Sequence, residues 1–318
     1  QSPLFGRFTG QWHLQPLPFS SLREFFPAWS AEERAALYAI VGGIPAYLRW
    51  LDSNLGLVAN IQEVILAPGS IFLAEPELLL YDELRDLSTY QAILRAISKG
   101  HHALKDISNA CLIGATSLTF HLGKLQELRL VERRLPITLT TTQQRRSKRG
   151  RYHLSDPFFQ FYFRFLFPHL KSLLSAEETT AHIKNELRAF VALGFERLGQ
   201  QWLVAQARAG NLPFTPQGVG SHWSRRVQVD VVGINHETRD ILLGECKWGT
   251  DKVGRKVVRD LIEEKGPKVR RDLPSGDDWR CYYAVFARAG FTEAATALLN
   301  DHGGLAVDLT ELDTVLSG

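Results

Sequence analysis

The chain has 318 residues, of which 45% are hydrophobic and 22% are charged, and its net charge is +3. This composition excludes a mostly disordered chain, and the length corresponds to roughly two domains of about 150 residues. No apolar run approaches the roughly 18 residues of a membrane-spanning helix, so we expect no membrane association, and three widely spaced cysteines exclude a disulfide framework and favour a reducing, cytoplasmic environment.

The chain starts with Gln1 and contains no methionine. A complete gene product starts with methionine, so we expect that either an upstream segment or the methionine positions are missing from the sequence. A short strand is predicted at 12–17, where a proline stops it. A helix is predicted from about Ala31, because Ser30 and Glu33 have the spacing of a capping box. Residues 1–80 show no strong core of their own, so they are expected to be part of something larger.

Residues 81–155 predict three helices followed by a β-hairpin. Apolar residues recur at helical spacing in three segments, around Ile93, around Ile107 and over Thr116–Leu128. Strand-like segments follow at 130–136 and 151–154, with a basic loop predicted between them at 140–150. This order is typical of a winged helix-turn-helix.

Positive charge is concentrated in this part of the chain. Residues 121–151 contain nine lysines and arginines but only two acids, which is the charge pattern of a protein that contacts an anionic partner. We expect DNA contacts from the basic cluster and from one lysine on the third helix; these residues are Lys124, Arg145, Arg146, Lys148, Arg149 and Arg151. The alternatives are a solvated loop and a winged helix that binds a protein partner.

Residues 156–318 predict an α/β domain. An aromatic helix at 158–167 is too apolar to lie on one face only, so we expect it to be wedged between domains. A long helix at 183–207 follows it. Strands and helices then alternate; the predicted strands are 227–234, 240–248, 279–287 and 304–309, and the predicted helices are 253–270 and 292–300. The expected fold class is therefore α/β and α+β.

Two of these strands carry carboxylates among aliphatic residues. Regular alternation places Asp230 on the face opposite Val229 and Val231, and it places Glu245 and Lys247 together on one face of the next strand. A carboxylate in apolar surroundings is costly unless a partner compensates its desolvation. Mg²⁺ binds through one or two carboxylates, keeps several waters and suits phosphate chemistry.

The order of Asp230 and the segment Glu245-Cys246-Lys247 resembles the PD-(D/E)XK nuclease core. In that family an upstream helical glutamate usually completes the metal site, and Glu196 in Gly194-Phe195-Glu196 matches it. The resemblance implies that Asp230, Glu245 and the carbonyl of Cys246 hold Mg²⁺ or Mn²⁺, and that Glu196 holds a second metal or a water.

In the same resemblance Lys247 positions the nucleophile, and Lys256 or Lys265 supplies a basic group from the following helix. The implied reaction is metal-assisted phosphodiester hydrolysis. The alternative is that Glu245 and Lys247 form a structural ion pair in a core that only binds DNA or a partner protein.

The similarity extends over the chain. Several segments together resemble the archaeal and bacterial DEXX-box, AAA-type ATPase family; they are 2–7, 17–19, 42–48, 75–80, 155–158 and 244–248. The resemblance implies the end of a P-loop ATPase domain at 1–80, a winged helix at 81–155 and a nuclease-like domain of unknown function at 156–318.

The chain departs from that family in one motif. It contains no G-x-x-x-x-G-K-[ST] segment. The resemblance therefore implies that the P-loop lies upstream of Gln1 and that ATP is bound only by a longer protein. Arg7 is either a nucleotide-sensing arginine of that protein or an ordinary surface arginine.

Overall fold

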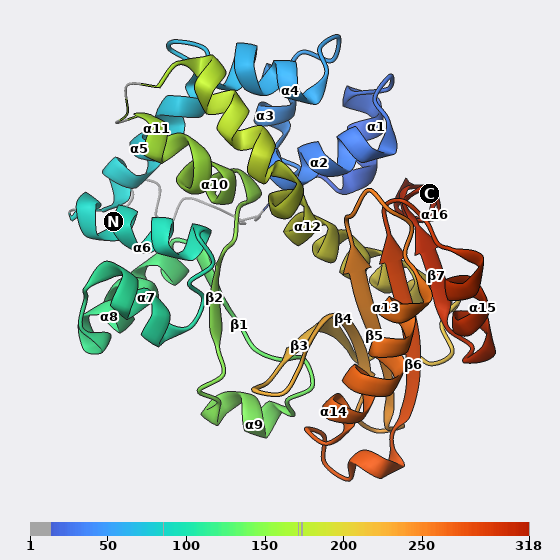
Figure 1. Cartoon of the computed structure of the whole chain (residues 1–318). Coiled ribbons are helices and arrows are strands. Elements are labelled where there is room, and N and C mark those ends of the chain that lie inside the picture. Colours follow the sequence, from blue (N-terminus) through green and yellow to red (C-terminus); the bar gives the residue numbers. More distant parts are fainter. Residues whose placement is uncertain (1–13, 85, 171, 173, 318) are drawn as a thin grey trace, which may run out of the picture.

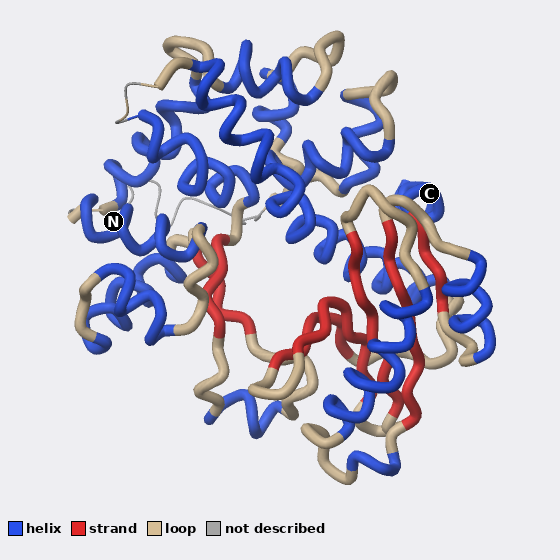
Figure 2. Tube along the Cα trace, viewed as in Figure 1, coloured by secondary structure: helices blue, strands red, loops and turns tan. Residues whose placement is uncertain are grey.

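The structure is a computed structural model that describes residues 14–84, 86–170, 172 and 174–317. It is mixed α/β, with a helical N-terminal part and a five-stranded sheet in the C-terminal part (Figures 1 and 2). No helix within these ranges has both the length and the apolar character that crossing a membrane requires. Arg7 and the start of the predicted strand at 12–17 lie outside the described residues, and 14–17 form no strand.

Short helices build the N-terminal layer. They are η1 (Phe19–Ser21), α1 (Leu22–Phe25), α2 (Ala31–Val41), α3 (Pro45–Trp50), α4 (Leu57–Ala59), the π-helical η2 (Asn60–Ile65) and α5 (Ile71–Glu83). The predicted capping box of α2 is confirmed, because Ser30 Oγ accepts the Glu33 N–H at 3.2 Å and Glu33 Oε2 accepts the Ser30 N–H at 3.0 Å. Gly42, with φ +64°, ends this helix in a backbone conformation that favours glycine.

Three helices and a two-stranded sheet follow, as predicted. The elements are α6 (Leu87–Ser98), α7 (Leu104–Cys111), α8 (Ala115–Glu127), β1 (Val131–Arg134) and β2 (Arg151–Leu154). The strands pair antiparallel, with Val131 opposite Leu154. The prediction of a loop throughout 140–150 is wrong, because α9 (Thr141–Arg146) forms there from a capping box between Thr140 and Gln143.

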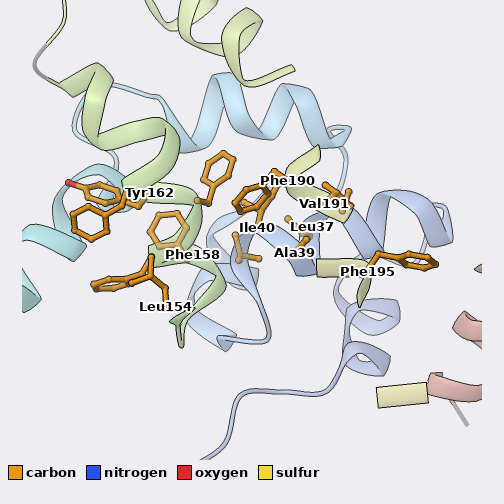
Figure 3. Close-up of a cluster of buried hydrophobic side chains, with 14 of the residues drawn as sticks. Leu37, Ala39, Ile40, Leu154, Phe158, Tyr162, Phe190, Val191 and Phe195 are labelled. Carbon is orange, nitrogen blue, oxygen red and sulfur yellow. The ribbon is translucent and has the colours of Figure 1, made fainter. Parts of the chain in front are cut away.

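Most of the aromatic segment, called here the aromatic wedge, is buried as predicted, whereas Leu170 at its end is 43% exposed. It consists of α10 (Pro157–Phe161), the π-helical η3 (Tyr162–Leu166) and α11 (Phe167–Leu170). Its side chains pack against α2 and the long helix α12 (Ala176–Ala209), where the rings of Phe161 and Phe165 contact Phe190. Figure 3 shows Phe158 and Tyr162 of this segment together with Ile40 of α2 and Phe190 of α12. One continuous core therefore joins the N-terminal helices, the aromatic wedge and α12.

The C-terminal sheet has the strand order β3-β4-β5-β6-β7. Its strands are β3 (Gly218–Trp223), β4 (Gln228–Asn235), β5 (Asp240–Lys247), β6 (Arg280–Ala287) and β7 (Leu305–Asp308). The first three pair antiparallel, whereas β5, β6 and β7 pair parallel. The sequence predicted all of these strands except β3.

Helices cover both faces of the sheet. α12 contacts β3, β4 and β5 on one face, and a second apolar core lies on the other. The elements of that second layer are α13 (Arg255–Arg259), the π-helical η4 (Asp260–Lys265), α14 (Gly266–Arg270) and α15 (Glu293–Asp301), with the short η5 (Gly276–Asp278) between them.

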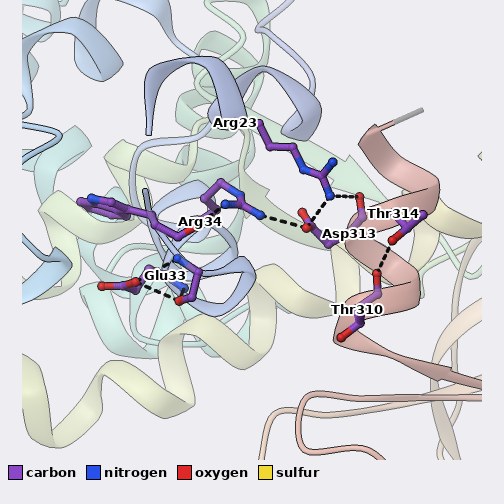
Figure 4. Close-up of polar contacts among 8 residues, drawn as sticks. Arg23, Glu33, Arg34, Thr310, Asp313 and Thr314 are labelled. Carbon is purple, nitrogen blue, oxygen red and sulfur yellow. Dashed lines mark hydrogen bonds and ion pairs between the residues drawn. The ribbon is translucent and has the colours of Figure 1, made fainter. Parts of the chain in front are cut away.

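The final helix, α16 (Leu309–Ser317), closes the C-terminal part onto the N-terminal helices. Asp313 accepts hydrogen bonds from Arg34 of α2 at 2.9 Å and from Arg23 of α1 at 2.7 Å (Figure 4). Arg34 and Asp313 are both buried, whereas the Arg23 side chain is about half exposed. This buried ion pair ties together two ends of the chain that are far apart in sequence.

Candidate functional site: a carboxylate and lysine cluster

A β-bulge lies at Asp230. Gly220 of β3 pairs with Val232 of β4, but His222 pairs with Val229, so β4 carries one extra residue between the two pairs. The expected alternation is therefore wrong at this point: Val229 joins the core under α13 and α14, whereas Val231 packs toward α12. Bulges redirect side chains and are common beside functional sites.

Asp230 and Glu245 occupy neighbouring positions on adjacent strands. Val231 pairs with Gly244 in these antiparallel strands. Asp230 precedes Val231 and Glu245 follows Gly244, so the two acids lie at the adjacent position of the pair. Asp230 Oδ2 accepts the N–H of Cys246 at 3.1 Å. The Asp230 carbonyl accepts a hydrogen bond from Gln200 of α12 at 3.0 Å, which fixes the bulge to that helix.

Two ammonium groups hold Glu245. Its residue exposure is only 7%, and its two carboxylate oxygens accept from Lys247 Nζ at 2.7 Å and from Lys265 Nζ at 2.6 Å. Of the two lysines considered on the following helix, Lys265 at the end of η4 therefore reaches the cluster. Lys256, on α13, forms no hydrogen bond or ion pair with it among the described residues.

Glu196 interacts electrostatically with the carboxylates of both Asp230 and Glu245. Burial, together with the charges of Asp230 and Glu245, raises the pKa of Glu196 from 4.5 to about 8. Arg197 and Arg134 act in the opposite direction but do not compensate. The three acids therefore repel one another in a poorly solvated site.

Burial and the same charges shift the pKa values of Asp230 and Lys247. Burial and the charge of Glu245 raise the pKa of Asp230 from 3.8 to about 6. Desolvation lowers the pKa of Lys247, but its hydrogen bond to Glu245 and the nearby negative charges outweigh this and raise the pKa above 10.5. Lys247 therefore remains an ammonium group at neutral pH.

The donor set has the chemistry that Mg²⁺ or Mn²⁺ requires, because hard cations take carboxylate and carbonyl oxygens. In the part of the chain that the structure describes, no three carboxylate, imidazole or thiol side chains are arranged to hold a metal as they stand. A cation at this cluster would have to compete with Lys247 and Lys265 for Glu245. Its charge would also favour the ionised forms of Glu196 and Asp230.

The structure separates the predicted DNA-contacting residues into two groups. Arg145, Arg146 and Lys148 are exposed around α9. Lys124 forms an ion pair with Glu127 on α8 at 3.2 Å. Contact of these four cations with DNA stays a prediction. Arg149 and Arg151 instead contact the C-terminal sheet: Arg149 donates to the carbonyl of Trp223, and Arg151 donates to Gln228 Oε1 at 3.0 Å. The basic segment is therefore partly a structural contact.

One constellation that the sequence did not reveal resembles a catalytic triad. Thr138 Oγ1 lies 2.8 Å from His222 Nδ1, and His222 Nε2 lies 3.3 Å from Asp272 Oδ2. Thr138 is only 4% exposed and His222 is fully buried, so no substrate reaches the hydroxyl. Burial also lowers the pKa of His222. This chain of hydrogen bonds links the β1–α9 connection to β3.

Comparison with known families adds to this geometry. Residues 162–258 match the DUF234 family model. That family is described as archaea bacterial proteins of unknown function. The matched segment contains the long helix and strands β3–β5, and with them Glu196, Asp230, Glu245 and Lys247.

A longer relative is also similar to the chain. It is an uncharacterized protein of Methanocaldococcus jannaschii, 32% identical over 290 residues, which is 91% of the chain and 63% of the relative. The chain thus spans less than two thirds of that protein. No solved structure matches the chain significantly.

Proposed function

We propose that the cluster on β4, β5 and α12 is a divalent-cation-dependent nuclease site that cleaves phosphodiester bonds in DNA. The observation that carries this proposal is the position of Asp230 beside Glu245, with Glu196 so placed that burial and these two charges raise its pKa to about 8. Carboxylates that repel one another in a poorly solvated site destabilise a fold, and such perturbed groups are common at functional sites. A divalent cation relieves this repulsion.

Each residue has a role in the proposed reaction. Asp230, Glu245 and the carbonyl of Cys246 would hold Mg²⁺ or Mn²⁺, and Glu196 would hold a second metal or a water. A metal in this position supplies an activated water and stabilises charge on the phosphate. Lys247, which stays protonated, acts as a hydrogen-bond donor that positions the water or a phosphate oxygen, not as a general base.

The order of elements supports the resemblance to the PD-(D/E)XK core. Glu196 lies on the helix α12, Asp230 and Glu245 lie on the paired strands β4 and β5 after the intervening β3, and Lys265 lies on the helical segment that follows. The three helices and hairpin before this core have the order of a winged helix. The exposed cations of α9, Arg145 and Arg146, favour contact with DNA phosphates.

Cleavage of supercoiled plasmid tests the proposal. We expect nicked and linear products with Mg²⁺ or Mn²⁺, and none with EDTA. Asp230→Ala and Glu245→Ala should abolish cleavage, while Glu237→Gln, an exposed glutamate in the β4–β5 turn, serves as the matched control. Cleavage that survives Asp230→Ala in purified protein would show that the site is misassigned.

A second function is supported by the contacts of Glu245. Both of its oxygens are bound by lysines, as in a structural ion-pair network. In this reading the module binds DNA or a partner protein without cutting it. Calorimetric titration with Mn²⁺ separates the two functions, because a folded protein without metal affinity fits only the non-catalytic one.

We also propose that any ATP hydrolysis belongs to a longer protein. The basis is the resemblance to the ATPase family, together with the 63% coverage of the longer relative. Expression with an upstream P-loop segment, followed by measurement of ATP turnover with and without DNA, tests this. Turnover that DNA stimulates would support it, and turnover by residues 1–318 alone would refute it.

A further inference from the structure

A strongly basic pocket lies between the β1–β2 hairpin and the C-terminal sheet. Its volume is about 760 Å³. Cationic side chains from both sides line it, together with one indole; these residues are Lys148, Arg149, Arg151, Trp223, Arg225 and Arg226. In Figure 1 the hairpin and α9 reach across to β3 at this point.

Several contacts fix the two walls of the pocket to each other. Ile137 N–H donates to the Ser221 carbonyl at 3.0 Å, which joins the chain after β1 to β3. Trp223 Nε1 donates to the Arg149 carbonyl at 2.9 Å, and the Arg149 guanidinium donates back to the Trp223 carbonyl. The guanidinium of Arg151 lies 4.9 Å from the centre of a Trp223 ring. The pocket is therefore built into the fold and does not depend on a mobile loop.

The charges that line the pocket are not balanced. Asp272 is its one acid among the described residues, and this carboxylate is already bound by Arg226 and His222. Lys148 and Arg225 are exposed and have no hydrogen-bond or ion-pair partner in the described part of the chain. Like charges held this close repel each other, and a bound anion relieves the repulsion.

We propose that this pocket binds backbone phosphates of DNA, with Lys148 and Arg225 as the contacting cations and Arg149 and Arg151 as the residues that hold its walls. A polyanion fits better than a single phosphate, because positive charge continues beyond the pocket at Arg145 on α9. The choice of DNA rests on the proposed function.

The position of the pocket connects it to the carboxylate cluster. Arg151 contacts Gln228, and Gln228 lies two residues before Asp230 in the same strand. Because the hairpin is fixed to this strand, a DNA backbone bound in the pocket has a defined position relative to Asp230. The pocket thus positions the substrate and does not take part in the chemistry.

Fluorescence anisotropy tests the assignment with a short fluorescein-labelled DNA duplex of mixed sequence, titrated in EDTA at several salt concentrations. We expect Arg225→Ala and Lys148→Ala each to weaken binding about tenfold and to lower the slope of log affinity against log salt by about one. The matched control is Arg208→Ala, which removes an exposed arginine at the end of α12 and should change affinity less than about twofold. Equal affinities of all three variants would overturn the proposal.

Two further measurements separate this proposal from that of the nuclease. Asp230→Ala should not weaken binding of the duplex in EDTA, because it removes a negative charge and leaves the pocket intact. If Arg225→Ala weakens binding but no protein cleaves DNA, the nuclease fails and the pocket stands. If cleavage is lost in Asp230→Ala but Arg225→Ala binds normally, the pocket fails and the nuclease stands. Competition by inorganic phosphate at concentrations matched to the phosphates of the duplex would show a site for free phosphate and would overturn the choice of DNA.

Discussion

Replacement of Glu196 by Gln should stabilise the metal-free protein at high pH. The side chain keeps its size but can no longer ionise beside Asp230 and Glu245. In the wild type the folded carboxyl has a pKa of about 8 instead of 4.5, so the folded state binds more protons than the unfolded state between these values. The contribution of Glu196 to the free energy of unfolding is therefore fully present below pH 4.5 and is lost as pH rises to about 8.

The magnitude follows from the same shift. Each pKa unit corresponds to about 1.4 kcal/mol, so the rise from 4.5 to about 8 amounts to ~5 kcal/mol. The unfolded carboxyl is already largely ionised at about pH 5, so about 4 kcal/mol of the difference should develop between about pH 5 and about pH 9. Glu196→Gln should lack this slope.

Urea unfolding at these two pH values, followed by tryptophan fluorescence in EDTA, measures the effect. Glu237→Gln, which removes an exposed carboxylate of the same type, should follow the wild type. If the free energy of unfolding of Glu196→Gln changes with pH as much as that of the wild type, the three carboxylates do not repel one another as described.

Two matched pairs of substitutions test the framework that holds the site. Gly194→Ala should cost about 1–3 kcal/mol in the free energy of unfolding, because a Cβ at this position would lie 2.3 Å from the Cβ of Ala39 on α2. Gly123→Ala, on the open face of α8 with no atom within 4 Å, should instead gain about 0.5–1 kcal/mol by helix propensity; equal effects of the two substitutions in thermal melts would refute the packing of α12 on α2. Asp313→Ala should cost about 3–5 kcal/mol, since it leaves the Arg34 guanidinium buried without its carboxylate. Arg23→Ala, which removes the half-exposed partner of the same carboxylate, should cost at most about 1 kcal/mol in chemical unfolding, and an equal cost would contradict the burial described.

The sequence predicts the elements whose patterns are local. Strands β4, β5 and β6 are dense in β-branched and other apolar residues, and the capping box at Ser30 needs only the residue three positions later. β3 was missed because Gly218 and Gly220 interrupt any alternation, and these glycines allow Ile137 to pack against the strand. Thr140 and Gln143 have the spacing of a capping box for α9, but the cluster of basic residues that follows is equally typical of a loop.

Features that depend on distant parts of the chain could not be read from the sequence. The bulge at Asp230 results from pairing with β3, a strand that no local pattern shows. Lys265 and Lys256 are the same residue type, and only the course of the helix after β5 determines which of them meets Glu245. The contact between Arg34 and Asp313 joins residues 279 positions apart. The sequence thus predicts candidate residues for the site, and long-range packing determines which of them come together.

The most direct measurement is a crystal structure of the protein soaked in Mn²⁺, with anomalous scattering used to locate the ion. We expect an anomalous peak between the carboxylates of Asp230 and Glu245, with Lys247 or Lys265 moved off Glu245. Well-diffracting crystals with both lysines still on Glu245 and no peak at this position would contradict it.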